Sequence, residues 1–408
     1  MQNGAIPVWL LLGSILAGAA GAETAWPGWR GPRGDGTSLD EAVPLKWDVA
    51  EDLAWKTRLP GSGHATPVVW EDAVFLVAAR DEERVLLRLD RRTGKIDWAE
   101  TVLEAPLEGK HRKNSFASST PATDGERVYV SFLDGEKMFV AAYGFDGGKL
   151  WEARPGIFSS VHGYCSSPVL WKDKVIINGD HDGEAYLVAL DKTTGKTVWK
   201  TARPNRKRSY CTPIIRTING RNQLMLSGSI CVASYDPDTG KQQWIIDGPT
   251  DQFVASLVYD GERLFMTCGF PEKHLMAIDP TGNGNVTESH VLWRSLKDPA
   301  YVPSPVVAGP FFMVVSDSGK ASCWDAKRGR RHWVEKIGRE HSASAVVVRG
   351  HACFLSERGV LTVIKPGKNY EEVAVNVLGE DTFASPVITH GQWLLRGSEH
   401  LFCIGAAE

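Results

Sequence analysis

The chain has 408 residues, of which 43% are apolar, and its 46 basic residues nearly balance its 49 acidic residues. The apolar fraction excludes an intrinsically disordered chain, and the net charge of −3 provides no basic surplus for binding nucleic acid. Because a single packed core usually stops growing at about 250–300 residues, we expect either several domains or one repeat architecture.

The first segment of the chain has the pattern of an export signal. Residues 6–20 form a short apolar run, and Ala20-Gly-Ala22 matches the small-x-small pattern of a cleavage site. The run is shorter than the ~20 residues that a membrane-spanning helix needs, and no later stretch is apolar enough to span. We therefore predict that residues 1–22 are a cleaved signal peptide and that the mature protein is periplasmic or extracellular.

A four-part unit recurs along the rest of the chain. In its clearest copy, short apolar or alternating runs begin at Cys165, Lys174, Tyr186 and Thr194 and are bounded by Gly, Asp or Thr. This pattern is typical of a four-stranded antiparallel meander, whose strands we call A to D. The A strand recurs at intervals of 40 to 54 residues, at Pro67, Pro121, Pro168, Pro213, Leu257, Pro305, Ala345 and Pro386.

Tryptophan marks the D strand, although the copy around Ala374 lacks it. A glycine in the preceding turn, as in Gly148-Lys149 and Gly195-Lys196, supplies the positive φ that a tight hairpin requires. A Trp at one fixed strand position can pack between neighbouring sheets, so we assign these residues to packing rather than to a ligand site. They are Trp55, Trp98, Trp151, Trp199, Trp244, Trp293 and Trp333.

The order of the strands predicts a closed ring. The first D strand, around Trp55, precedes every A strand, and the last unit ends after its C strand near Ile404. Pairing of these two ends would remove both unpaired sheet edges. We predict an all-β, eight-bladed β-propeller of four-stranded antiparallel blades, closed by an N-terminal D strand. Its parts are a lead-in at 23–50, the propeller at 51–404 and a tail at 405–408.

The unit from Leu187 to Trp199, Leu-x-Ala-Leu-Asp-x-x-Thr-Gly-Lys-x-x-Trp, resembles the repeat of the pyrroloquinoline quinone (PQQ) propeller superfamily. The opening from Trp26 to Ser38 also looks like the lead-in of exported PQQ-like proteins. The superfamily includes quinoprotein alcohol dehydrogenases and the outer-membrane assembly lipoprotein BamB. The resemblance therefore implies a propeller fold, with either PQQ and Ca²⁺ as cofactors or a role in assembly.

Several features of quinoprotein dehydrogenases are missing from this sequence. It has no adjacent cysteines and no haem motif, and His64 stands three residues before Pro67, where these enzymes carry a cofactor-contacting Glu. No inward carboxylate heads an A strand, and the lipid-anchor Cys of BamB is also absent. These differences favour a non-catalytic protein over a PQQ-dependent enzyme.

The seven cysteines include no Cys-x-x-Cys pair, which excludes zinc ribbons and c-type haem attachment. Most occupy strand positions where Cys behaves as a small buried apolar residue. Cys165 and Cys211 begin neighbouring A strands, so a disulfide between them is possible.

Longer loops connect D to A strands on one face of the ring, where function usually concentrates. Three successive loops there are basic, aromatic or His-bearing, which predicts either a site for an anion or merely solvated charges. The acidic run Gly179–Glu184 has the oxygen content of a calcium loop, but its place between two strands predicts a turn and no metal. The candidate ligand residues are His64, Arg112, Asn114, His162, Tyr164, Arg206, Lys207, Tyr210 and His341.

The preferred functional hypothesis is a non-catalytic, exported binding or scaffold module, expected to be monomeric. Its ligand at the loop-rich face would be a protein, a glycan or a small anion. The alternative is a PQQ-dependent alcohol or sugar dehydrogenase, in which the quinone supplies the redox chemistry. A third hypothesis is an assembly scaffold like BamB, which receives unfolded clients on strand edges or loops.

Overall fold

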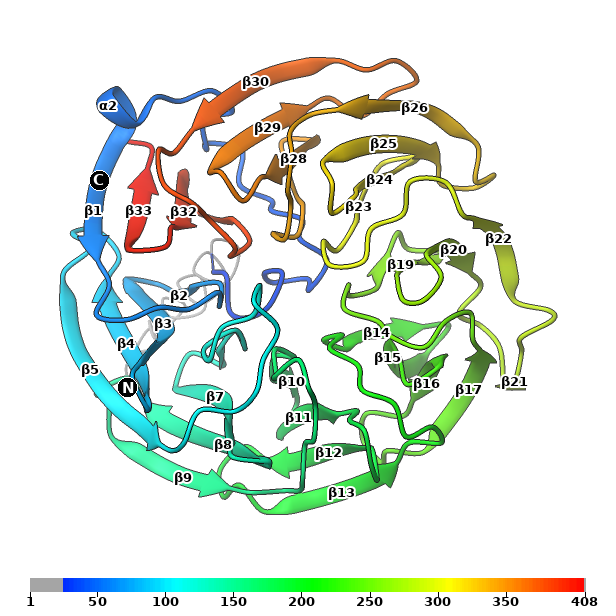
Figure 1. The fold of residues 1–408 in the computed structure, drawn as a ribbon, viewed down its shortest axis with the longest axis horizontal. Coiled ribbons are helices and arrows are strands. Elements are labelled where there is room, and N and C mark those ends of the chain that lie inside the picture. Colours follow the sequence, from blue (N-terminus) through cyan, green and yellow to red (C-terminus); the bar gives the residue numbers. More distant parts are fainter. Residues whose placement is uncertain (1–24, 407–408) are drawn as a thin grey trace, which may run out of the picture.

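The computed structural model describes residues 25–406 and contains eight antiparallel sheets arranged around a central axis (Figure 1). The predicted all-β, eight-bladed propeller is confirmed. The predicted signal peptide at 1–22 lies outside the described residues. Among residues 25–406 the structure has no helix long and apolar enough to cross a membrane, and the short helix α2 spans Val49–Asp52.

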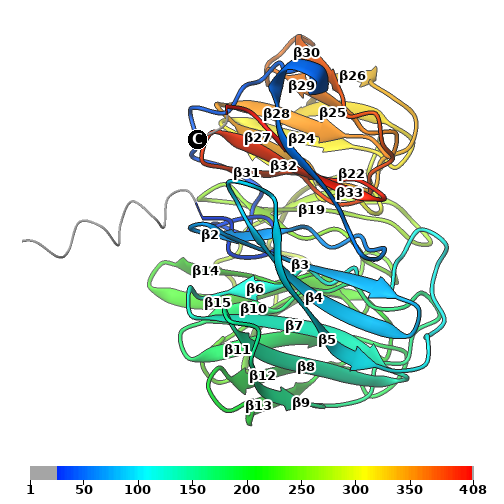
Figure 2. The same ribbon diagram turned by 90° about the vertical axis from the view of Figure 1, so that its left-hand side faces the viewer.

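The blades follow one another around the ring, each contributing its A strand to the centre (Figures 1 and 2). Blade 1 consists of β2 (Val68–Trp70), β3 (Ala73–Arg80), β4 (Glu83–Asp90) and β5 (Ile96–Glu104). Blade 2 consists of β6 (Ala122–Thr123), β7 (Arg127–Asp134), β8 (Lys137–Gly144) and β9 (Lys149–Ala153). Blade 3 consists of β10 (Val169–Trp171), β11 (Lys174–Gly179), β12 (Tyr186–Asp191) and β13 (Thr197–Ala202). Blade 4 consists of β14 (Ile214–Ile218), β15 (Arg221–Gly228), β16 (Cys231–Tyr235) and β17 (Gln242–Asp247), with β21 (Gly284–Asn285) added in parallel to its outer edge.

The second half of the ring repeats the arrangement. Blade 5 consists of β18 (Val258–Tyr259), β19 (Leu264–Cys268), β20 (His274–Ile278) and β22 (Val291–Ser295). Blade 6 consists of β23 (Val306–Ala308), β24 (Phe311–Val315), β25 (Lys320–Asp325) and β26 (Arg331–Lys336). Blade 7 consists of β27 (Val346–Val348), β28 (His351–Leu355), β29 (Val360–Ile364) and β30 (Glu372–Val377). Blade 8 consists of β31 (Val387–Thr389), β32 (Gln392–Arg396), β33 (His400–Ile404) and β1 (Leu53–Arg58).

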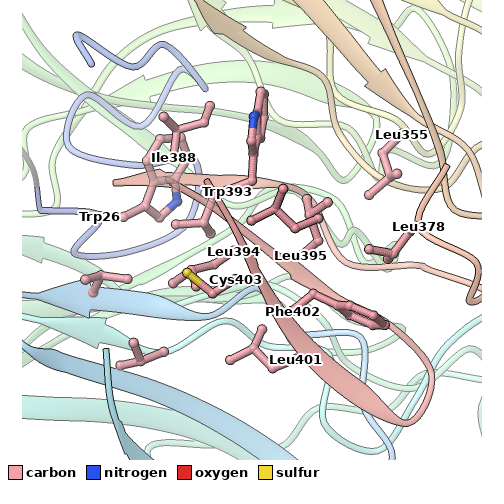
Figure 3. Packing of buried hydrophobic residues seen from close by; sticks show 14 of the residues in the cluster. Trp26, Leu355, Leu378, Ile388, Trp393, Leu394, Leu395, Leu401, Phe402 and Cys403 are labelled. Atoms are coloured by element: carbon pink, nitrogen blue, oxygen red, sulfur yellow. The ribbon is translucent and has the colours of Figure 1, made fainter. Parts of the chain in front are cut away.

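Blade 8 closes the ring with strands from both ends of the chain. Strand β1 pairs antiparallel with β33, and Trp55 lies opposite Cys403 in the register. This confirms the predicted closure by an N-terminal D strand. The adjoining core is continuous with the lead-in, because Trp26 shares one buried cluster with Ile388 and Trp393 (Figure 3).

The D-strand tryptophans connect neighbouring blades, as predicted. The indole N–H of Trp151 in blade 2, for example, donates to the carbonyl of Lys192 in the C-to-D turn of blade 3, at 2.8 Å. Gly195 in that turn has φ 69°, and a Cβ there would lie 2.5 Å from the Trp151 ring. Glycine is therefore required both for its backbone conformation and for the approach of the indole. Equivalent bonds are made by Trp55, Trp98, Trp199, Trp293 and Trp333.

Two details of this pattern differ from the sequence prediction. In blade 2 the positive φ belongs to Gly147, at 89°, and not to Gly148. Trp244 in blade 4 donates within its own blade, to the side chain of Gln223 at 2.6 Å. The next C-to-D connection carries the extra strand β21 in place of the usual short turn, which explains the different partner.

The lead-in crosses the central channel (Figure 1), and its bridges to the A strands of blades 1 and 7 place it near the A-to-B turns. Trp26 pairs with Val69 of blade 1, and Thr37 pairs with Val347 of blade 7 on another side of the ring. Between them, the indole N–H of Trp29 donates to the Ser256 hydroxyl of blade 5 at 3.0 Å. The lead-in thus places a large aromatic side chain on the axis, below the heads of the A strands.

Candidate functional site

A cavity of about 120 Å³ lies on the axis between the heads of the A strands and Trp29. Each of the eight blades contributes to its wall the residue that stands three positions before the A-strand proline or its equivalent. We call these residues the outer ring. They are His64, Ser118, Cys165, Tyr210, Val254, Val302, Ser342 and Phe383.

Two residues further along each strand lies a second layer, which we call the inner ring. Side chains of a strand alternate between its two sides, so residues two apart point the same way. Every member is Ser or Thr, and those of blades 4 to 8 line the cavity. The inner ring consists of Thr66, Thr120, Ser167, Thr212, Ser256, Ser304, Ser344 and Ser385.

The inner ring connects the blades by hydrogen bonds. At six junctions the backbone N–H of one member donates to the hydroxyl of the next, at 2.9 to 3.0 Å. The series is interrupted between Thr212 and Ser256, where the Trp29 indole binds the Ser256 hydroxyl. It is also interrupted between Ser385 and Thr66, and the Thr66 hydroxyl is buried with no partner in the described chain.

The loop that precedes blade 2 lies across the mouth of the cavity. Asn114 donates its side-chain N–H to the carbonyl of His162 at 2.8 Å, and the Lys113 ammonium lies 2.8 Å from Glu357 and 3.4 Å from Glu340. Burial lowers the pKa of Lys113, but its hydrogen bonds to the two glutamates outweigh this effect and raise it. The loop is therefore held between blade 3 on one side and blade 7 on the other.

Burial also shifts the ionisation of His64 in the outer ring. Its ring stacks on Phe383 with centroids 4.4 Å apart. Burial, and then the positive charge of Arg396, lower the pKa of His64 to about 4, so the imidazole is neutral at pH 7. Arg396 itself is 1% exposed and donates to the carbonyls of Ala65 and Val77.

Three of the predicted ligand residues, His64, Asn114 and Tyr210, line the cavity. Tyr210 also hydrogen-bonds Ser160 through its hydroxyl at 2.7 Å. His162 lies at the rim, where its carbonyl binds the crossing loop and its ring contacts Tyr210 with centroids 6.1 Å apart. Arg112 is exposed and does not contribute to the wall.

Two other predicted residues are buried away from the cavity. Tyr164, one of the candidate ligand residues, does not point toward the axis but lies in the core between blades 2 and 3 and hydrogen-bonds Ser131. It precedes the outer-ring residue Cys165 by one position, so strand alternation directs it to the opposite side. His341 is 1% exposed and lies outside the cavity wall, where burial lowers its pKa to about 4.

The basic loop of blade 4 is neutralised by the acidic run before it. Arg206 lies 3.8 Å from Glu184, and Arg203 lies 2.8 Å from Asp180, both fully buried. Lys207 pairs with Asp251 at 3.5 Å. The acidic run therefore supplies partners for arginines, and within residues 25–406 no group of three or more His, Cys, Asp or Glu is arranged to hold a metal ion.

Cys165 and Cys211 are both free thiols in the structure, so the possible disulfide between them is not formed. Burial raises the pKa of Cys165 to about 12. The Cys165 thiol in the cavity wall is therefore protonated and a poor nucleophile at neutral pH.

Sequence reasoning missed most of the outer ring, although a signal for it was present. The sequence prediction considers the position three residues before the A-strand proline only in blade 1, at His64. The same count in the other blades gives Ser118, Val254, Ser342 and Phe383, among others. Lys113 had no such signal, because its acidic partners lie more than 220 residues away in sequence.

A family model described as outer membrane protein assembly factor BamB matches residues 45–115 and 107–335. The chain belongs to this PQQ-like repeat propeller family. The fold resembles that of BamB from Moraxella catarrhalis, with a TM-score of 0.62 and 12% identity over 87% of this chain and 99% of that one. It also resembles quinohemoprotein alcohol dehydrogenase from Comamonas testosteroni, with a TM-score of 0.68 and 14% identity over 96% of this chain and 84% of that one.

Curated relatives of this PQQ-like propeller include two proteins named polyvinylalcohol dehydrogenase. The one from a Sphingopyxis species is 22% identical over 65% of this chain and 50% of its own length. The one from a Pseudomonas species is 22% identical over 54% of this chain and 40% of its own length. The chain thus spans about half the length of these relatives or less, and the similarity to solved structures at 12–14% identity shows the fold alone.

The cavity of this propeller does not fit PQQ and Ca²⁺. Calcium binds six to eight oxygen ligands and prefers carboxylates, but neither ring contains an Asp or Glu. PQQ carries three carboxylates, and the one cation in the cavity wall, Lys113, is already paired with two glutamates, so the wall has no free positive charge to balance a triple anion. The donor set instead consists of hydroxyls, one amide, one neutral imidazole and aromatic faces.

Proposed function

We propose that this PQQ-like propeller is an exported, non-catalytic binding module that holds a small polar ligand, such as a sugar unit, in its axial cavity. Residues 1–22 would direct the protein to the periplasm or the cell exterior, where it acts as a monomer. The observation that carries the proposal is the outer ring: one repeated position, in one cavity wall, occupied by side chains of very different chemistry.

The composition of the wall supports a sugar-sized ligand. Tyr210, Phe383 and the Trp29 floor offer aromatic surfaces, which combine apolar area with a defined geometry. Ser118 and Ser342 add hydroxyls beside them. A polar ligand bound in a concave site needs such placed polar groups for its orientation and apolar surface for its affinity.

The ionisation states favour binding over catalysis. Nucleophilic catalysis requires an activated nucleophile next to a base, whereas burial keeps the Cys165 thiol protonated with a pKa of about 12. The pKa of His64, about 4, makes its imidazole a weak base at pH 7.

The proposal can be tested with a variant that fills the cavity. Val254 lines the wall and its side chain makes no hydrogen bond, so Val254→Trp occupies the cavity without breaking one. Val161→Trp is the matched control, because Val161 is 63% exposed in the loop of blade 3. Purified proteins would be screened by thermal shift against monosaccharides, disaccharides and sugar acids.

We expect ligands that raise the Tm of the wild type and of Val161→Trp but not of Val254→Trp. An equal rise in all three proteins would place binding outside the cavity and contradict the proposal. Stabilisation by PQQ with Ca²⁺, together with dye reduction by an alcohol, would show the dehydrogenase alternative to be correct.

A further inference from the structure

Within residues 25–406, no acceptor binds the hydroxyl protons of the inner ring. A Ser hydroxyl has one proton and two acceptor lone pairs. In Ser304, Ser344 and Ser385 the oxygen accepts the backbone N–H of the preceding blade. No described residue accepts their protons, and all three residues line the cavity. Blades 6 to 8 therefore present three adjacent hydrogen-bond donors to whatever occupies the cavity.

The junction between blades 8 and 1 adds more donors that lack a partner. The Thr66 hydroxyl and the Nε and Nη2 atoms of Arg396 are buried without a hydrogen bond in the described chain. Arg396 reaches this junction from β32 and binds the carbonyl of Ala65, the neighbour of Thr66, through Nη1 at 2.9 Å. His64 is the outer-ring residue of blade 1, the blade of Thr66, and the charge of Arg396 contributes to lowering its pKa.

The charge of Arg396 is not balanced within the described chain. Two other fully buried arginine side chains have carboxylate partners: Arg84 pairs with Glu108 at 2.7 Å, and Arg203 pairs with Asp180 at 2.8 Å. No carboxylate of residues 25–406 lies within ion-pair distance of Arg396, although its side chain is as deeply buried. Buried charges are normally paired, but Arg396, which binds the carbonyl of Ala65 next to the cavity-lining His64, has no such partner within residues 25–406.

We propose that the ligand of the cavity is a small carboxylic acid of the sugar-acid type, whose carboxylate accepts hydrogen bonds from the hydroxyls of Ser304, Ser344 and Ser385. A carboxylate has about four acceptor sites and forms stronger hydrogen bonds than a neutral oxygen does. The charge of Arg396 favours the anion from behind the wall. The uncharged part of the ligand lies against Tyr210 and Trp29. This inference rests on the proposed function, because it names the ligand class of the same cavity.

The test compares D-glucuronate with D-glucose, which have similar size and differ mainly in the carboxylate. Isothermal titration of the full chain at pH 7 is expected to give a Kd for glucuronate at least about ten-fold lower than for glucose, since a charged acceptor roughly doubles the strength of each hydrogen bond. Acetate should compete with glucuronate at higher concentration, because it carries the same group.

Ser344→Ala removes one of the proposed donors and should weaken glucuronate binding about ten-fold while changing glucose binding little. Thr120→Ala is the matched control. It deletes the same type of inner-ring hydrogen bond, from the N–H of Thr66, but Thr120 does not line the cavity. Both variants should lose similar stability, and only Ser344→Ala should lose preference for the carboxylate. Ser344→Thr keeps the hydroxyl and should restore the preference.

Two results would overturn this inference and leave the proposed function standing. In the first, glucose and glucuronate bind equally, and both are blocked by Val254→Trp. In the second, Ser344→Ala and Thr120→Ala weaken glucuronate binding to the same extent. If no sugar, sugar acid or acetate binds to the wild type, both this inference and the proposed sugar-sized ligand are wrong.

Discussion

Two positions of the repeat, one at each side of a blade, behave very differently. The first position, on the D strand at the rim of the propeller, is Trp in seven of eight copies, and six of these tryptophans make the same hydrogen bond to the next blade. The second position, three residues before the A-strand proline, forms the outer ring of the cavity and is occupied by six different kinds of residue in eight copies. A position that packs blades together is nearly uniform, because most junctions have the same shape. A position that varies among equivalent blades is not required for packing and is available for a ligand.

The largest expected effect is a loss of stability when a D-strand tryptophan is substituted. Trp151→Ala removes a buried indole, 8% exposed, and its bond to Lys192. We expect the free energy of unfolding to fall by about 3–5 kcal/mol. Denaturation in urea, followed by intrinsic fluorescence, measures this loss.

The matched substitution at the variable position is Val254→Ala in the outer ring. Val254 is only partly buried and lines the cavity, so its truncation should cost about 1 kcal/mol or less. If both substitutions cost the same, the variable position has a packing role, and the contrast between the two positions is wrong.

Acidification should destabilise the protein through an outer-ring histidine, His64, and a buried histidine outside the cavity, His341. Burial lowers the pKa of both His64 and His341 to about 4 in the folded protein, from 6.5. Between these values the unfolded state binds more protons, so stability is highest above pH 6.5 and falls as the pH drops toward 4. Each histidine contributes up to about 3 kcal/mol to this fall.

Thermal unfolding from pH 7.5 to pH 4 measures the histidine effect. His64→Gln and His341→Gln should each flatten part of the profile. At pH 7.5, His64→Gln should leave the Tm nearly unchanged, because its ring belongs to the cavity wall, whereas His341→Gln should lower it. An unchanged pH profile in both variants would refute the assignment.

The uniform part of the molecule could be predicted from the sequence, and the variable part could not. The prolines and tryptophans recur at regular intervals, so strands, blades and closure follow from counting. The prediction that Tyr164 contacts a ligand is wrong because Tyr164 immediately precedes Cys165. Side chains alternate along a strand, so if Cys165 faces the cavity, Tyr164 faces the core. The contact of Lys113 with Glu357 depends on the curvature of the ring, which brings loops 244 residues apart into contact.

A smaller effect concerns the turns that receive the tryptophans. Gly195 and Gly220 both have positive φ, at 69° and 76°, but a Cβ would strike the Trp151 ring only at Gly195 and would meet open space at Gly220. Gly220→Ala should therefore cost about 1 kcal/mol for backbone strain alone. Gly195→Ala should cost about twice as much in urea denaturation, since the indole must also move. Equal costs would mean that the approach of the indole does not constrain this turn.

The smallest effect is expected at the basic loop that the sequence singled out. Arg206 is mostly exposed, with Glu184 as its partner at 3.8 Å, and Lys207 pairs with Asp251 at the surface. Because exposed ion pairs contribute little, Arg206→Ala and Lys207→Ala should each change stability by less than about 0.5 kcal/mol. Neither residue lines the cavity, so the affinity for a cavity ligand should also stay the same. A loss of affinity with unchanged stability would show that ligand capture depends on the charged loop after all, and would move the site from the variable ring to the surface around it.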